Sequence, residues 1–198
     1  MRCSFLILIL GSLLMTGCSS QPSNINNVCT IFDENSDWYD AAKDVQKKWG
    51  VPLHVTMAFI HQESKFVSDA KPPRSTFLWI FPGPRPSSAY GYAQVLDETW
   101  DHYLSKTRNY GADRDDFEDA VDFIGWYNYT SHKRLGISKW NAKQLYLAYH
   151  EGHGGYERKT YLKKKWLLKV SNKVQRKASQ YLKQYKSCKA DLERGWFF

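Results

Sequence analysis

The sequence has almost none of the alternating pattern typical of β-strands, and its 198 residues contain no internal repeat and no low-complexity tract. These absences exclude a mainly β fold and a repeat architecture. Its long apolar run, residues 5–14, is too short to span a bilayer as part of a mature chain. After the polar segment that follows this run, roughly 170 residues remain, which is enough for one domain with a hydrophobic core.

The N-terminal segment has the form of an export signal. Met1-Arg2 supplies positive charge, and the apolar run leads into Leu14-Met15-Thr16-Gly17-Cys18. Small residues before a cysteine resemble the lipobox of bacterial lipoproteins, in which cleavage leaves a lipidated cysteine. The resemblance implies a signal peptide at residues 1–17, a lipid anchor on Cys18, a polar tether within 18–30, and location at the periplasmic face of the outer membrane. A plain secretory signal with a chance cysteine is the alternative.

Cysteine is scarce, with four residues in the whole chain. Once the signal and the lipidated position are set aside, Cys29 and Cys188 remain, one near each end of the folded part. An exported protein meets an oxidising compartment, so a disulfide between them is a candidate, and two free buried thiols are the alternative. Two sulfur atoms so far apart in sequence do not favour a metal site.

Acidic residues are absent between Arg158 and Lys189, a segment that contains twelve lysines and arginines. We expect a basic C-terminal helix at residues 161–198 that packs on the main domain at 31–160. Its charged face either balances an acidic body in solvent or attracts anionic envelope polymers such as phospholipid or lipopolysaccharide. Nucleic acid is not expected as a partner of an exported chain.

Helical periodicity predicts an all-α, lysozyme-like fold. Helices are expected near residues 36–50, 52–64, 97–106, 115–133, 141–150 and 158–187. Five prolines within residues 71–86 exclude a continuous helix there, so residues 75–92 would hold a loop or a small hairpin. In the last helix, the apolar residues expected to share one buried face are Leu162, Trp166, Val170, Val174, Ala178, Tyr181 and Tyr185.

Glu63 is the residue with the clearest catalytic potential. It stands at the end of an apolar helix, where the helix dipole and the apolar surroundings both disfavour a negative charge. Such a site raises the pKa of a carboxyl group, and a carboxyl group that keeps its proton near neutral pH can act as a general acid. An ordinary glutamate in a surface ion pair at a helix end is the alternative.

Three short motifs occur in a recognisable order. They are Gln62-Glu63-Ser64, then Gly91-Tyr92-Ala93-Gln94, then Ala148-Tyr149-His150 with Gly152. Together they resemble the soluble-lytic-transglycosylase domain of glycoside hydrolase family 23, which is related to goose-type lysozyme. That family has Glu-Ser, Gly-Leu-Met-Gln, and Ala-Tyr-Asn with a following glycine. The resemblance covers residues 36–160 and implies no cofactor, no metal and a monomer that acts on peptidoglycan.

The resemblance implies that Glu63 is the single catalytic acid and base. It would protonate the bond between N-acetylmuramic acid and N-acetylglucosamine and then accept the proton of the attacking 6-hydroxyl, which gives a 1,6-anhydro end. This reaction does not require the second carboxylate of ordinary glycosidases. A hydrolytic muramidase and a non-catalytic glycan-binding lipoprotein are the alternatives. The sequence leaves open whether the enzyme serves wall turnover or a secretion or conjugation apparatus.

The resemblance also assigns substrate-binding roles to the neighbours of Glu63. Gly91 would let the backbone approach the Glu63 helix, and Gln94 would offer its amide to the sugar. The Ser64 hydroxyl would either bond substrate or form a hydrogen bond to the backbone of its own helix. Tyr149 would place its hydroxyl near the catalytic carboxyl or serve as a core aromatic. His150 departs from the family's asparagine.

A resemblance to a zinc-peptidase motif in His150-Glu151-Gly152-His153 is not expected to be meaningful. The two histidines are three residues apart, whereas His-Glu-x-x-His needs a spacing of four to place both on one helix face. Glycines at 152, 154 and 155 are expected to break the helix and form a turn there.

Overall fold

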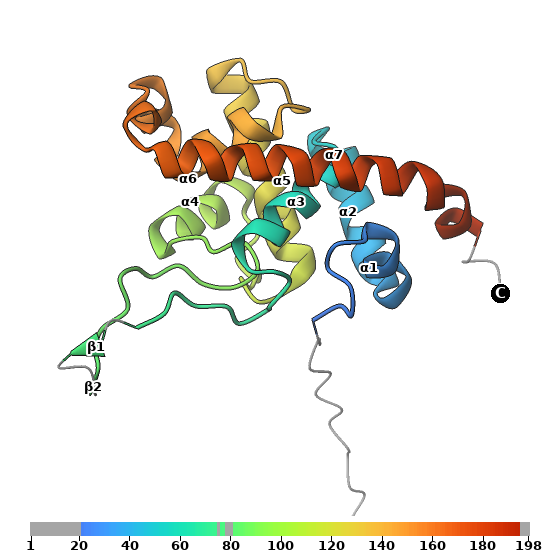
Figure 1. The fold of residues 1–198 in the computed structure, drawn as a ribbon, viewed down its shortest axis with the longest axis horizontal. Coiled ribbons are helices and arrows are strands. Elements are labelled where there is room, and N and C mark those ends of the chain that lie inside the picture. The colour runs from blue at the N-terminus through green and yellow to red at the C-terminus, as the bar shows by residue number, and fades with distance from the viewer. Residues whose placement is uncertain (1–20, 75, 78–80, 195–198) are drawn as a thin grey trace, which may run out of the picture.

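A computed structural model describes residues 21–74, 76–77 and 81–194. These residues form an all-α body with one small hairpin (Figure 1). The fold is therefore the all-α, lysozyme-like class that the sequence predicts. The elements are α1 (Val28–Glu34), α2 (Ser36–Trp49), α3 (Leu53–Glu63), β1 (Thr76–Phe77), β2 (Phe81–Pro82), α4 (Asp97–Thr107), α5 (Phe117–Leu135), α6 (Ala142–Glu157), the 3₁₀ helix η1 (Thr160–Lys163) and α7 (Lys165–Arg194).

Helix α3 forms the centre of the core. Every residue from Leu53 to Ile60 is buried, because α2, α5 and α7 pack around this helix. Pro52 caps its start in an extended conformation, which suits a residue that has no backbone N–H to donate. The helix ends at Glu63, so the chain brings this carboxyl out of the core at a fixed position.

Helix α7 is 30 residues long and crosses α1, α3 and α6 (Figure 1). The predicted buried face is wrong at its beginning: the helix starts at Lys165, so Leu162 lies in η1 and is 59% exposed, and Trp166 is 54% exposed. A step of four residues rotates about 40° beyond a full turn, so a row spaced by fours drifts around the helix. The residues that α7 buries are Leu167, Ser171, Val174, Ala178, Tyr181 and Leu192.

The segment before α2 belongs to the fold and is not a tether from residue 21 onward. The Tyr181 hydroxyl donates to the carbonyl of Ile25, and the side chains of Gln180 and Gln184 donate to the carbonyl of Asn26. A disulfide joins Cys29 of α1 to Cys188 of α7, with 6.0 Å between their Cα atoms. The N-terminal segment is thus held along the C-terminal helix.

The strands β1 and β2 pair in antiparallel fashion, with Thr76 opposite Pro82, inside the range expected for a hairpin. The hairpin stands away from the helical body at the end of a long loop (Figure 1). The predicted signal peptide and the lipidation site Cys18 lie outside the described residues. None of the helices described is long and apolar enough to cross a membrane.

Candidate active site

A cavity of about 510 Å³ opens at the C-terminal end of α3. The end of α3, the loop at residues 89–96, α5 and the bend in α6 form its walls. Glu63, Gln94, Tyr149 and His150, all predicted as site residues, line this cavity together. Residues from three distant parts of the sequence therefore meet at one place.

Glu63 presents its carboxyl group to this cavity. Its Oε1 atom is inaccessible to solvent and has no hydrogen-bond partner among the described residues. Burial raises the pKa of Glu63 from 4.5 to about 7, against smaller opposing effects of the Tyr146 hydroxyl and the Lys65 charge. Near neutral pH the group therefore exists in both protonated and ionised forms. A residue that acts first as an acid and then as a base needs both forms.

Tyr149 forms the apolar wall beside Glu63. Its ring packs edge-on against Phe59, with 5.3 Å between centroids, and against Tyr127, at 5.1 Å. Its hydroxyl donates to the carbonyl of Ala93 at 2.6 Å. Burial and the nearby charge of Glu63 raise the pKa of Tyr149 well above 10, so the ring remains neutral and helps to exclude water from the carboxyl group.

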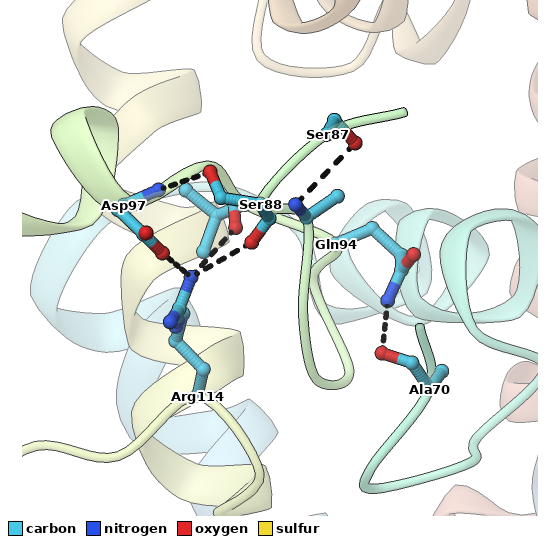
Figure 2. A network of polar contacts seen from close by, with 8 residues as sticks. Ala70, Ser87, Ser88, Gln94, Asp97 and Arg114 are labelled. Carbon is cyan, nitrogen blue, oxygen red and sulfur yellow. Dashed lines mark hydrogen bonds and ion pairs between the residues drawn. The ribbon is translucent and has the colours of Figure 1, made fainter. Parts of the chain in front are cut away.

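Gln94 occupies the loop side of the cavity in a left-handed conformation, with φ at 49°. Its side-chain nitrogen donates to the carbonyl of Ala70 at 2.8 Å (Figure 2). It also donates to the carbonyl of Gly91 at 2.9 Å. Both N–H groups of the amide are thus used within the protein, which leaves the carbonyl oxygen for a ligand. Gln94 is consequently an acceptor for a sugar hydroxyl or an N-acetyl N–H.

Arg114, which no sequence motif indicated, holds this loop in place. Figure 2 shows its guanidinium donating to the carbonyls of Ser88 and Val95, at 3.3 and 3.1 Å, and to Asp97 at 2.7 Å. The Ser88 hydroxyl accepts a hydrogen bond from the backbone of Asp97. One side chain therefore joins both ends of the loop that forms the cavity wall.

Gly91 serves a different contact from the one expected. Its φ is 76°, and a Cβ atom there would lie 2.0 Å from the carbonyl oxygen of Arg114. The closest approach is therefore to the chain before α5 and not to the Glu63 helix. Ser64 does not line the cavity, since its buried hydroxyl donates back to the carbonyl of Ile60 at 3.4 Å.

His150 and Glu151 form the opposite rim of the cavity. Burial alone would raise the pKa of Glu151, but hydrogen bonds from Lys164, Thr160 and His150 lower it to about 2. An ionised carboxylate only accepts hydrogen bonds, so Nδ1 of His150 is the donor in their 3.1 Å contact. Because Nδ1 is used in this contact, Nε2 is the ring nitrogen left for a ligand.

The bend that creates this rim is at Gly152. Its φ of 70° and ψ of 160° interrupt α6, yet the helix resumes and continues to Glu157. The expected turn is therefore a single-residue break. His153 does not pair with His150, because its Nε2 bonds to the Ser131 hydroxyl at 2.9 Å. Across the described parts of the chain, no three His, Cys, Asp or Glu side chains are grouped to hold a metal ion.

The central buried helix thus ends in a glutamate of raised pKa at the wall of a cavity, an arrangement suited to general acid catalysis. The model of the transglycosylase SLT domain family matches residues 6–188 of this chain. The chain belongs to this family, whose members are peptidoglycan lytic transglycosylases, and the match extends beyond residues 36–160 to include most of α7. No curated protein and no solved structure matches the chain significantly.

Proposed function

We propose that this protein cleaves the β-1,4 bond between N-acetylmuramic acid and N-acetylglucosamine in peptidoglycan and leaves a 1,6-anhydromuramoyl end. The observation that carries the proposal is Glu63, whose pKa is about 7 and whose carboxyl faces a cavity of about 510 Å³. Family membership supports the substrate, and the raised pKa of this carboxyl supports its role as an acid.

The chemistry needs one residue in two roles. Protonated Glu63 donates its proton to the glycosidic oxygen as the bond from that oxygen to C1 of the muramoyl residue breaks. Ionised Glu63 then accepts the proton of the muramoyl 6-hydroxyl while the oxygen of that hydroxyl forms a new bond to C1. The proton lost in the first step is regained in the second, and no water is consumed.

The neighbours of Glu63 support this sequence of events. The Tyr149 ring and the buried Oε1 atom keep the carboxyl poorly solvated, which favours the protonated form before the reaction. Gln94 Oε1 is an acceptor on one side of the cavity, and the His150 ring offers its second nitrogen on another, so a sugar can bond both through its hydroxyl and N-acetyl groups. These contacts would hold the muramoyl ring with its 6-hydroxyl near C1.

Hydrolysis by a muramidase is the second candidate, because Glu151 is another carboxylate at the same cavity. An inverting glycosidase would need that carboxylate to activate water. Three donors, Lys164, Thr160 and His150, already occupy Glu151, and its side chain is 3% exposed. Its environment favours a role in positioning His150.

Product analysis distinguishes these reactions. Purified sacculi are digested with the wild-type protein and the soluble fragments are identified by mass spectrometry. The proposal expects anhydromuramoyl ends, which are 18 Da lighter than reducing ends because no water is added. Reducing-end muramic acid would establish hydrolysis, and binding without products would establish a glycan-binding protein.

We also propose that the protein is anchored by lipid at Cys18 and faces the periplasm from the outer membrane. Support comes from the sequence around Cys18, which resembles a lipobox. Metabolic labelling with a fatty acid tests this part separately. Label is expected in the wild type and absent from Cys18→Ser, and label in neither protein would contradict the anchor.

A further inference from the structure

A second cavity, of about 370 Å³, lies between the C-terminal part of α3 and the middle of α7. Lys65, Lys173 and Lys177 line it together with His61 and Gln62. None of its lining residues is acidic. Three ammonium groups thus share a small cavity without a carboxylate.

The positive charge of this cavity is not neutralised by the described residues. None of the three lysines forms an ion pair there; Lys65 donates to the carbonyl of His61 at 2.6 Å, and Lys177 donates to the Asn26 side chain at 2.7 Å. Burial lowers the pKa of Lys65; the nearby charge of Glu63 opposes this shift, and the charges of Lys177 and Lys173 add to it. The lysines therefore repel one another, and a bound anion would relieve that repulsion.

The cavity is adjacent to the catalytic carboxyl. Gln62 and Lys65 belong to the same turn of chain as Glu63, at the end of α3. Helix α7 lines the lysine cavity, and its Trp166 contacts His150 at the rim of the catalytic cavity, with 5.0 Å between ring centroids. Lys173 follows Trp166 by seven residues, or roughly 10 Å along the helix. An anion held by the lysines would lie close to the mouth of the catalytic cavity.

We propose that Lys65, Lys173 and Lys177 form a subsite that binds the carboxylates of the peptide stems carried by the glycan strand. This inference rests on the proposed function, because the stem is attached to the muramoyl residue whose bond would be cleaved beside Glu63. Three extended residues span about 10 Å, which matches the offset along α7. The stems bear free carboxylates, and lysine ammonium groups pair with carboxylates as mobile point charges.

An anionic membrane surface is the competing occupant. The Gln21 side chain donates to the carbonyl of Lys65 at 2.6 Å, so the segment that follows the proposed anchor at Cys18 lies near the lysines. The position of the lysines in a cavity next to the catalytic turn favours the stem.

The test compares glycan strands that carry stems with the same strands after an amidase has removed them. For Lys173→Ala, the ratio of kcat/KM on stem-bearing strands to kcat/KM on bare strands should fall about threefold to tenfold. Lys183→Ala removes the same charge from an exposed position on α7 outside the cavity and should leave the ratio unchanged. An unchanged ratio in Lys173→Ala, or an equal fall in both variants, would overturn the subsite.

Binding of the free stem peptide separates this proposal from the proposed function. The tetrapeptide stem is titrated into Glu63→Gln protein, and shifts of the Gln62 and Val174 amide signals are followed by NMR. Saturable shifts that weaken in Lys173→Ala support the subsite even if no glycan is cleaved. Absence of stem binding, together with Lys173-dependent binding to phosphatidylglycerol vesicles, would assign the lysines to the membrane and overturn the proposal.

Discussion

Replacing Glu63 by glutamine should stabilise the protein at alkaline pH, although it removes the proposed catalytic group. The pKa of Glu63 is raised from 4.5 to about 7 by burial. Between these values the native state binds a proton that the unfolded chain has released, so stability falls as pH rises. Each pH unit in that interval lowers the free energy of unfolding by about 1.4 kcal/mol. The total loss above pH 7 is therefore at most about 3 kcal/mol.

Urea denaturation at pH 4 and pH 8 measures this effect. Glutamine keeps the shape and does not titrate, so Glu63→Gln should match the wild type at pH 4 and exceed it by about 2–3 kcal/mol at pH 8. The control Glu98→Gln alters an exposed glutamate in the first turn of α4 and should lower stability at pH 8 by a few tenths of a kcal/mol. If Glu63→Gln had the same effect at both pH values, Glu63 would not be a poorly solvated acid.

Three further predictions concern the frame around the site. Gly91→Ala should lower the free energy of unfolding, measured by urea denaturation, by about 2–4 kcal/mol, because the new Cβ would meet the Arg114 carbonyl and the φ of residue 91 is positive. An unchanged free energy of unfolding would contradict this packing. Replacing Cys29 and Cys188 by serine should lower stability by about 3–5 kcal/mol, since the bridge spans 159 residues; an unchanged urea midpoint would argue against it. His150→Asn should keep kcat/KM within about threefold, since asparagine also offers an acceptor, and a 100-fold loss would show that imidazole chemistry is needed.

The parts of the fold that could be predicted are those with strong local patterns. The glycine at position 50 and the proline at 52 marked the boundary between α2 and α3, and the apolar run of α3 indicated a buried helix. A raised pKa for Glu63 could be predicted from its place at the end of an apolar helix, although the tyrosines around its carboxyl, Tyr146 and Tyr149, come from α6. Helix boundaries and the burial of α3 could be predicted because neighbouring residues in the sequence determine them.

Other features depend on contacts between distant segments. Helix α1 follows a polar run that resembles a linker, and it is ordered by α7 and by the disulfide at Cys29. Arg114 acquires its role from a loop that it meets only in three dimensions, and Glu151 of α6 acquires its role from Thr160 and Lys164 beyond the end of that helix. Gly91 matched the family motif, but its partner, Arg114, could not be found from the motif.

Comparison of wild-type and Glu63→Gln protein on purified sacculi tests the central claim most directly. The rate of release of anhydromuramoyl fragments is followed by mass spectrometry at pH 6, where the wild-type carboxyl is largely protonated. Loss of the general acid should reduce the rate by at least about 100-fold, while the variant remains folded. Release of the same anhydro products at an undiminished rate by Glu63→Gln would contradict the assignment of Glu63 as the catalytic acid and base.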